Sequence, residues 1–513
     1  MKQVPYIAKN ENGIPTLYVE NAPFLIIGGE LHNSSSSSLE FMEQEVWPYL
    51  RPLCMNTVVL PIAWETMEDE KGNYDFSLLE GLLTQARREG KKLVLLWFGL
   101  WKNGESFYVP AWMKEDYRQY FRACYAKGVP SDTISPFCQA AVEADQRAFC
   151  RLMEYLKEYD GEEQTVIMVQ VENEIGFLGA ERDFSEAAEK KYREAIPEKL
   201  EFLSPNNAKG NSWYETFGEN APEMFMAWQY ACAVEQIVSE GKKRYPLPMY
   251  VNAWLKQHPD RPGVYPSGGP VVSMLSVWKA AAPSLDFYAP DIYVPDFKGT
   301  CEDYGREGNP LFIPEARRDP VTASNAFYAF GGGQALGFSP FGIEDFMREN
   351  FVLPDAGQLE ELNIEMRAFN CQGTGPYIQK SYEILQGIEG EILKYRGTDR
   401  MKAFLRNNPD ERGEIISMGE YDLQLDYSEG ISGSGGIIFQ EEKGFYIAGS
   451  NVRFRPLPKK GSGLRLTIVR MEEGSFVNGV WKRRRILNGD ELHEQRLGDL
   501  AEMKYVKICL YNA

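Results

Sequence analysis

The sequence predicts a (β/α)8 barrel, an α/β fold of the TIM type, followed by a small all-β domain of sandwich type. Three observations predict it: eight short apolar runs of strand character over the first 350 residues, helical patterns between them, and a change to short alternating runs near residue 400. We expect residues 1–395 to form the catalytic barrel and residues 396–513 the β domain. An open doubly wound sheet has the same periodicity, but no GxGxxG follows the first strand to support a dinucleotide fold.

The expected barrel strands are short apolar runs in a regular order along the chain. They cover residues 24–28, 57–61, 93–98, 166–171, 248–253, 287–292, 311–314 and 335–338. Amphipathic stretches between them predict helices over residues 39–53, 77–89, 143–158 and 221–240. A long helical pattern over residues 355–394 is expected to be the final helix of the barrel. Beyond it, alternating runs at 435–439, 444–448, 464–469 and 504–510, separated by Gly, Asn and Asp turns, predict the β domain.

Composition narrows the classes of partner. The formal charge of -19, from 74 acidic and 55 basic residues, argues against nucleic acid and anionic membranes and fits a neutral substrate. The eight cysteines form no CxxC pair and the three histidines are few, so we expect no metal, no other cofactor and no disulfide framework. Scattered thiols, no apolar leader and no apolar run near 18 residues predict a cytoplasmic protein. A homo-oligomer is left open.

The most informative stretch is TVIMVQVENEIG, residues 165–176. An apolar run of strand character ends abruptly in Glu172, Asn173 and Glu174. A buried strand that carries carboxylates to its C-terminal edge serves acid–base chemistry at a barrel mouth. The alternative is a solvated strand end whose charges have no role.

A catalytic pair needs a second carboxylate at the end of another strand. The candidates by position are Glu30, Glu65, Asp291, Asp296 and Glu315. Glu315 is the best of these, because it follows a compact apolar run and because Arg317 and Arg318 lie nearby and could keep it ionised. If the strands are counted correctly, Glu174 ends strand four and Glu315 ends strand seven, nearly opposite each other across the barrel mouth.

The barrel resembles glycoside hydrolase family 35, one of the (β/α)8 glycosidase families whose acid/base follows strand four and whose nucleophile follows strand seven. It is most similar to bacterial β-galactosidase-like members with a small C-terminal β domain. The stretches that carry the resemblance are LLWFGLWKN (95–103), VIMVQVENEIG (166–176), PMYVNAW (248–254), YPSGGP (265–270), WKAAAP (278–283), APDIY (289–293), NPLFIPEA (309–316) and ALGFSPFG (335–342). They span the barrel in order, whereas the β domain is matched by position more than by motif.

The resemblance implies a role for each matched residue. Glu174 would be the general acid/base and Glu315 the nucleophile of a retaining hydrolase, which needs carboxyl groups about 5–5.5 Å apart rather than the roughly 6.5–9.5 Å of an inverting one. Asn173 would bind the sugar 2-hydroxyl, and Tyr293 would hydrogen-bond the nucleophile. Glu174 must be protonated near neutral pH, so its surroundings should raise its pKa.

Further residues are weaker candidates for substrate contact, each with packing as the alternative. Indoles that could stack on a sugar ring are Trp97, Trp101 and Trp254, possible hydroxyl ligands are Glu30 and Trp64, and a possible wall residue is Phe341. Alternation along the strand turns Glu172 away from Asn173, which predicts a structural residue paired with Arg or Lys.

The function that we expect is a retaining exo-glycosidase that releases terminal β-linked galactose from imported oligosaccharides or glycosides. Three alternatives stay open. The same mechanism could act on a β-linked arabinopyranoside, fucoside or glucoside. The barrel could bind carbohydrate without catalysis. A metal-dependent enzyme could use Asp291, Glu315 and Glu174 as ligands.

Overall fold

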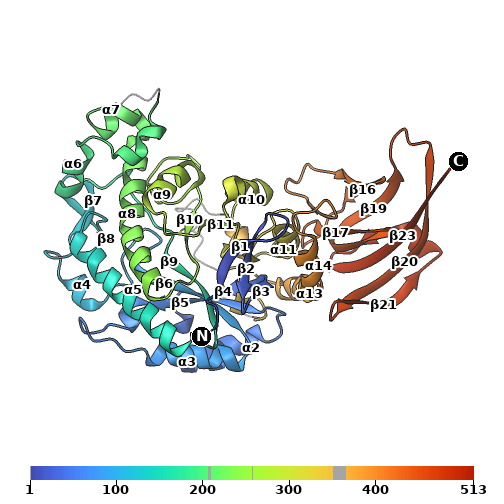
Figure 1. Ribbon diagram of the computed structural model, residues 1–513, viewed down its shortest axis with the longest axis horizontal. Helices are drawn as coiled ribbons and strands as arrows, with labels where there is room; N and C mark the ends of the chain where they lie inside the picture. The colour runs from blue at the N-terminus through green and yellow to red at the C-terminus, as the bar shows by residue number, and fades with distance from the viewer. Residues whose placement is uncertain (1, 206–209, 257, 350–356, 358–364, 513) are drawn as a thin grey trace.

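The computed structural model describes residues 2–205, 210–256, 258–349, 357 and 365–512. Eight parallel strands form a barrel on one side of the molecule, and antiparallel sheets lie on the other (Figure 1). The barrel strands are β4 (Ile26–Glu30), β5 (Thr57–Ala63), β6 (Lys92–Lys102), β9 (Val166–Asn173), β10 (Met249–Trp254), β11 (Phe287–Ile292), β12 (Glu315–Ala316) and β13 (Gly337–Phe338). Neighbours pair in this order, β13 pairs with β4, and an Ile313–Phe338 bridge closes the ring. The predicted barrel is confirmed.

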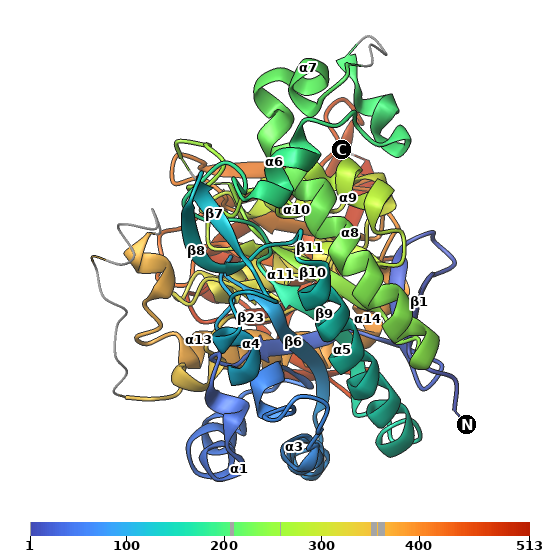
Figure 2. The same ribbon diagram turned by 90° about the vertical axis from the view of Figure 1, so that its left-hand side faces the viewer.

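Helices surround the barrel and bury one face each. Among them are α3 (Ser77–Arg88), α5 (Gln139–Tyr159), α8 (Ala221–Arg244), α9 (Leu275–Ala281) and α10 (Phe297–Tyr304). Figure 2 shows α5 and α8 side by side along the barrel. They approach closely because Gly241 of α8 has no Cβ, which would lie 2.4 Å from the ring of Phe149. The expected helix over residues 39–53 is instead two short α-helices, α1 (Leu39–Phe41) and α2 (Trp47–Leu50), joined by a π-helical segment, Met42–Val46.

Alternation along β6 separates the barrel interior from the layer beneath the helices. Val94, Leu96 and Phe98 belong to the apolar cluster inside the barrel. Leu93, Leu95 and Trp97 belong to the cluster shared with the helices. The strand period of two therefore assigns Val94, Leu96 and Phe98 to the interior, but it does not continue to the end of β6, where Leu100 belongs to the cluster shared with the helices and the pairing with β9 shifts register. The N-terminal sheet of β1 (Tyr6–Lys9), β2 (Pro15–Val19) and β3 (Ala22–Phe24) contributes Leu17 and Val19 to the interior cluster.

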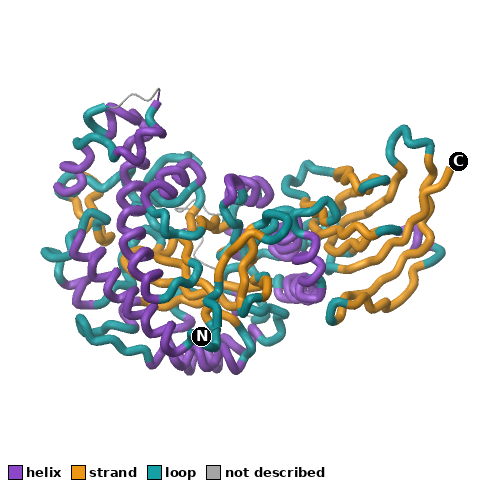
Figure 3. Tube along the Cα trace, viewed as in Figure 1, coloured by secondary structure: helices purple, strands orange, loops and turns teal. Residues whose placement is uncertain are grey.

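The C-terminal strands, drawn in orange toward the C-terminus in Figure 3, form two antiparallel sheets. An apolar core lies between the two sheets. The six-stranded sheet has the order β14-β17-β18-β23-β20-β21 and the four-stranded sheet the order β15-β16-β19-β22. Their bounds are β14 Met401–Leu405, β15 Gly413–Met418, β16 Tyr421–Tyr427, β17 Gly435–Glu441, β18 Gly444–Ser450, β19 Val452–Pro458, β20 Leu464–Val477, β21 Val480–Leu487, β22 Arg496–Leu497 and β23 Glu502–Asn512. The predicted all-β arrangement after the barrel is confirmed.

The six-stranded sheet is covered on both faces. Ile438 of β17 belongs to the core between the two sheets, whereas Ile437 and Phe439 belong to the core shared with the barrel. The barrel element opposite them is α11 (Thr322–Gly331), in which every residue is buried. Because α11 is buried on every side, it needs packing partners on every side, and the barrel and this sheet supply them.

The long final helix predicted over residues 355–394 is not continuous. Residues 355, 356 and 358–364 lie outside the described residues; after them come a 3-10 helix (Met366–Phe369), α13 (Gly375–Gly387) and α14 (Glu389–Tyr395). Gly373 has a φ of 75°, which ends regular helix before α13, and α13 itself ends at a glycine. None of the helices within the described residues is long and apolar enough to cross a membrane.

Candidate active site

Three carboxyl groups meet at the C-terminal end of the barrel strands. Glu174 follows β9, Asp291 lies in β11, and Glu315 begins β12. Each offers one oxygen within 4.8 Å of an oxygen of the other two, and all three side chains are buried. Parallel pairing sets the cluster, because Asp291 is in register with Glu315. Enzymes with a (β/α)8 barrel hold their reacting groups at the carboxyl ends of the parallel strands.

The surroundings of Glu174 keep it protonated at neutral pH. Burial, followed by the charge of Glu315, raises the pKa of Glu174 to about 8, against the opposing effects of Lys102 and a hydrogen bond with Asp291. Its backbone N–H donates to Asn252 Oδ1 at 2.9 Å. The Asn252 amide in turn donates to Asp291 Oδ2 at 2.6 Å, so one side chain links the two strand ends.

Glu315 is the carboxyl group with the most support for its anion. Burial raises its pKa, and four neighbours oppose that rise: first Lys102, then hydrogen bonds with Tyr293 and Glu30, then His32. The Tyr293 hydroxyl donates to Glu315 Oε1, and its ring stacks on Phe369 with centroids 4.5 Å apart. These neighbours favour the Glu315 anion, whereas burial and the charge of Glu315 favour the proton on Glu174, and acid-assisted nucleophilic attack requires such a difference between the two groups.

The arginines predicted to keep Glu315 ionised have other partners. Arg317 donates to Asp319 at 2.6 and 2.9 Å, and Arg318 donates to Asp345 at 2.5 Å. The cation with the largest effect on Glu315 is Lys102, at the end of β6. Alternation along β6 does not indicate Lys102, because even-numbered Leu100 belongs to the cluster shared with the helices and the register with β9 shifts between Trp97 and Lys102.

Glu30 and Asn173 also lie at this mouth with unused polar atoms. Burial, followed by the charge of Glu315, raises the pKa of Glu30 well above its ordinary range. Among the described residues, no donor reaches either carboxyl oxygen of Glu30 or Glu315 Oε2, so Glu30 bonds Glu315 only when one of the two carries a proton, and no acceptor reaches Asn173 Nδ2. Buried polar atoms without partners are costly, so their convergence indicates a polar ligand at this mouth.

Glu172 points away from the mouth and pairs with another carboxyl group, not with the Arg or Lys that we predicted. It accepts hydrogen bonds from the backbone N–H of Leu100 and Trp101 at 3.1 and 2.7 Å, and Asp145 of α5 accepts from Leu100 at 3.1 Å. Burial and the neighbouring Asp145 raise the pKa of Glu172 well above its ordinary range, which leaves a proton between the two groups. Gly99 makes room, because a Cβ there would lie 2.5 Å from Asp145 Oδ2 and 2.7 Å from Glu172 Oε1.

Left-handed backbone at the end of β9 explains why Glu172 points away from the mouth while Asn173 points into the barrel. Glu172 and Glu174 have φ values of 63° and 46°, a region that residues other than glycine seldom adopt. Strict alternation from Val171, which faces the helices, would turn Glu172 inward. The turn at Glu172 reverses this, so that Asn173 faces Lys102 inside the barrel. Such outliers persist where surrounding contacts hold them, and they cluster at functional sites.

Three tryptophans predicted to contact substrate are packed under the helices instead. Trp64, Trp97 and Trp101 are fully buried. Their indole N–H groups donate to Glu68, to Asp145 and to the carbonyl oxygen of Ile134 at 2.6, 2.8 and 2.9 Å. Both indoles of β6 belong to the cluster shared with the helices, so they offer no free face to a sugar.

Trp254 remains a predicted stacking residue and Phe341 a predicted wall residue. Trp254 ends β10 and is half-buried. Phe341, also half-buried, is bridged through its backbone to Glu30. Its ring meets His32 edge-on with centroids 5.0 Å apart. Both residues therefore lie at strand ends on the rim that carries the carboxyl groups.

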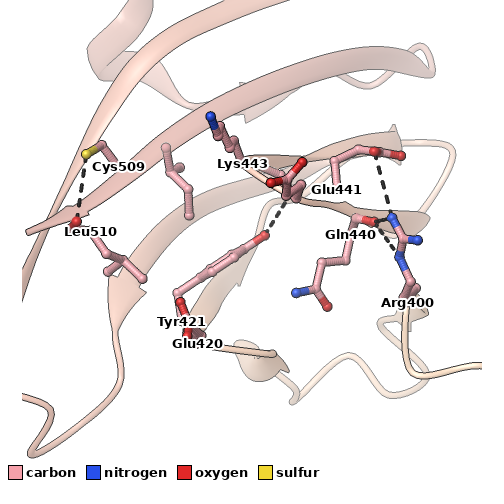
Figure 4. A pocket seen from close by; sticks show the side chains of 11 residues that line it. Arg400, Glu420, Tyr421, Gln440, Glu441, Lys443, Cys509 and Leu510 are labelled. Atoms are coloured by element: carbon pink, nitrogen blue, oxygen red, sulfur yellow. Dashed lines mark hydrogen bonds and ion pairs between the residues drawn. The ribbon is translucent and has the colours of Figure 1, made fainter.

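A hollow lies in the β region, away from these strand ends (Figure 4). It has a volume of about 630 Å³, and its lining includes Arg400, Tyr421, Gln440 and Glu441. Arg400 donates to the Gln440 carbonyl oxygen at 3.0 and 3.2 Å and lies 3.8 Å from Glu441. The Tyr421 hydroxyl donates to the Gly444 carbonyl at 3.2 Å. These polar groups satisfy one another, unlike those of the barrel mouth.

Comparison with protein families agrees with the geometry of the barrel mouth. Residues 16–266 match the family described as Glycosyl hydrolases family 35. These residues form a glycoside hydrolase family 35 domain. Residues 378–497 match a second family, a domain of unknown function (DUF5597), whose match begins inside α13. No curated protein matches the chain.

Solved structures similar to this hydrolase share little sequence with it. They include a β-galactosidase from the psychrophilic Marinomonas ef1, with 12% identity, a TM-score of 0.48 and coverage of 72% of this chain and 60% of that one. A β-galactosidase from Bacillus circulans sp. alkalophilus has 10% identity, a TM-score of 0.48 and coverage of 94% and 99%. An exo-β-1,4-mannosidase from Opitutaceae bacterium strain TAV5 has 14% identity, a TM-score of 0.45 and coverage of 75% and 63%. The chain spans less than two thirds of the Marinomonas protein, and these matches are too distant to assign a substrate.

Proposed function

We propose that this family 35 hydrolase is a retaining exo-enzyme that releases terminal β-linked galactose from oligosaccharides or glycosides. The observation that carries the proposal is the separation of Glu174 and Glu315, whose nearest carboxyl oxygens lie within 4.8 Å. This spacing supports direct attack by one carboxylate, for which the carboxyl groups lie about 5–5.5 Å apart, over the inverting reaction, which needs roughly 6.5–9.5 Å.

The first step of the proposed reaction forms a covalent intermediate. Glu315 attacks the anomeric carbon while Glu174 donates its proton to the departing glycosidic oxygen, so that one C–O bond forms as another breaks. The proton is available because Glu174 has a pKa of about 8. In the second step, Glu174 takes a proton from water, the water oxygen attacks the anomeric carbon, and Glu315 leaves as a carboxylate.

The remaining groups at the mouth are proposed to bind the sugar. Tyr293 orients Glu315 through its hydrogen bond. Asn173 and Glu30 offer their unused atoms to sugar hydroxyl groups. A polar group that loses a buried partner is costly, so these contacts discriminate against sugars that lack the matching hydroxyl.

Glu315→Gln and Glu174→Gln test the pair on an aryl β-galactoside. The proposal expects each to lower kcat/KM by at least about 100-fold, since both the nucleophile and the proton donor act in the first step. Azide should restore turnover of Glu315→Ala with inversion at the anomeric carbon. Exposed Glu11→Gln is the matched control and should leave the rate unchanged. Near wild-type rates in both site variants would refute the proposal.

Two rivals are separated by direct measurements. A panel of aryl β-glycosides with galactose, arabinopyranose, fucose and glucose ranks the sugar by kcat/KM. The three clustered carboxyl oxygens could also hold a divalent cation. The charge of Lys102, which acts on both Glu174 and Glu315, opposes that reading. Activity that survives exhaustive chelation would exclude a metal-dependent reaction.

We also propose that the protein works in a reducing compartment on imported substrates. All eight cysteines are free, which supports this but does not distinguish among reducing compartments. Fractionation of the native cells, with the protein detected by antibody, tests the predicted cytoplasmic location.

A further inference from the structure

Lys102 places a buried positive charge among the carboxyl groups of the barrel mouth. It ends β6, and its side chain is almost fully buried, with the ammonium nitrogen 5.2 Å from the ring centre of Phe98. The nitrogen donates to Asn103 Oδ1 at 2.7 Å and to Asn173 Oδ1 at 2.8 Å. An ammonium group is donor-only, so both amides must turn their oxygen atoms toward it.

This contact determines what Asn173 can offer to a ligand. With Oδ1 bound to Lys102, the group left for a ligand is the Nδ2 amide, which is buried and has no partner among the described residues. Asn173 is therefore a hydrogen-bond donor toward the mouth. An asparagine without such a neighbour could present either atom, because the two ends of the amide are nearly equal in shape.

The charge of Lys102 also ties together side chains from three further strands. It is the leading effect that lowers the pKa of Glu30, Glu174 and Glu315, which follow or lie in β4, β9 and β12. A buried ammonium is stable only beside anions, and a buried carboxylate only beside cations or donors. Lys102 thus stabilises the ionised state of the site while it holds Asn173.

We propose that Lys102 is a specificity-determining positioning residue, which fixes the Asn173 amide so that its N–H groups meet an acceptor oxygen on the sugar carbon next to the reacting centre. The inference rests on the proposed function, because that function places the sugar between Glu174 and Glu315 beside Asn173. A sugar with a hydroxyl at this carbon satisfies the amide. A 2-deoxy sugar leaves the amide without a partner, and a 2-ammonium sugar faces both the amide donors and the charge of Lys102.

Lys102→Met tests the role, because methionine keeps the apolar length of the side chain without the charge or the donors. The readout is the ratio of kcat/KM for an aryl β-galactoside to that for its 2-deoxy analogue. We expect Lys102→Met to reduce this ratio by about tenfold, the size of one lost buried hydrogen bond. The acid limb of the pH profile should also move to higher pH, since Glu315 loses its main opposing charge.

Two comparisons separate positioning from general damage. Lys91→Met removes a half-buried lysine that bonds the Met55 carbonyl at the other end of β6, and it should leave the ratio unchanged. In an Asn173→Ala background, Lys102→Met should alter the ratio little, because the residue through which it acts is gone. Calorimetric titration with galactose and 2-deoxygalactose reads the same contact without turnover.

The outcomes distinguish this inference from the proposed function. An unchanged ratio in a folded Lys102→Met protein, or a loss equal for both substrates, overturns the role of Lys102 and leaves the hydrolase intact. If no aryl glycoside is turned over by the wild type, the proposed function fails, and the binding ratio of the two sugars then decides for or against Lys102 alone.

Discussion

The protonation state of Glu174 can be tested through stability as well as through rate. In Glu174→Gln the side chain keeps its shape but has no proton to lose. The native pKa of about 8 lies above the ordinary value of 4.5, so the buried carboxyl group contributes stability that is present below pH 4.5 and is lost as the pH rises to 8. The gap of about 3.5 pH units, at about 1.36 kcal/mol per unit, corresponds to about 5 kcal/mol.

Urea denaturation of both proteins at several pH values between 5 and 9 measures this difference. We expect the wild type to lose about 1.4 kcal/mol of unfolding free energy per pH unit relative to Glu174→Gln, and the difference to level off above about pH 8. Exposed Glu11→Gln provides the control, with a curve parallel to the wild type. Parallel curves for Glu174→Gln as well would show that Glu174 is ionised at neutral pH, and the assignment of the general acid would be lost.

Two further predictions concern the support of the site and the attachment of the β region. Gly99→Ala should lower the free energy of unfolding, measured by urea denaturation, by about 1–3 kcal/mol, because the new Cβ would collide with Asp145 and Glu172. The control is Gly390→Ala in α14, which has open space around it and should be neutral or stabilising. Ile437→Ala should lower the free energy of unfolding by about 2–5 kcal/mol, because the side chain packs against Gly331 in the core shared with the barrel. The variant should keep a single unfolding transition, and two separate transitions would contradict the shared core.

The two faces of a strand explain why the sequence predicted the barrel strands correctly and the tryptophan contacts wrongly. The apolar runs located the barrel strands, because parallel strands are buried on both faces and need uninterrupted apolar residues. The same alternation along β6 would have placed Trp97 outside, but it does not extend to Trp101 and Lys102, because the register with β9 shifts between Trp97 and Lys102. We expected the tryptophans to meet the sugar because aromatic rings are the usual sugar platforms, which weighs residue type above strand face.

Other features depended on contacts that no local pattern carries. The proton-sharing contact of Glu172 with Asp145 joins a strand to a helix, and the left-handed backbone at Glu172 is held by those contacts rather than by the residue itself. The partners of Arg317 and Arg318 likewise lie in the chain that follows them, at Asp319 and Asp345. Charge alone predicted salt bridges near Glu315 without indicating which acid each arginine would meet.

The burial of α11 on all sides has a consequence for synthesis on the ribosome. When α11 emerges, its inner face can dock on the barrel strands already made, but the strands that cover its outer face, β14 and β17, are still to be translated. Until then an apolar helix surface is open to solvent, to chaperones or to another nascent chain. The hydrolase therefore reaches its mature form late in translation, although the residues that we assign to the reaction have all left the tunnel earlier.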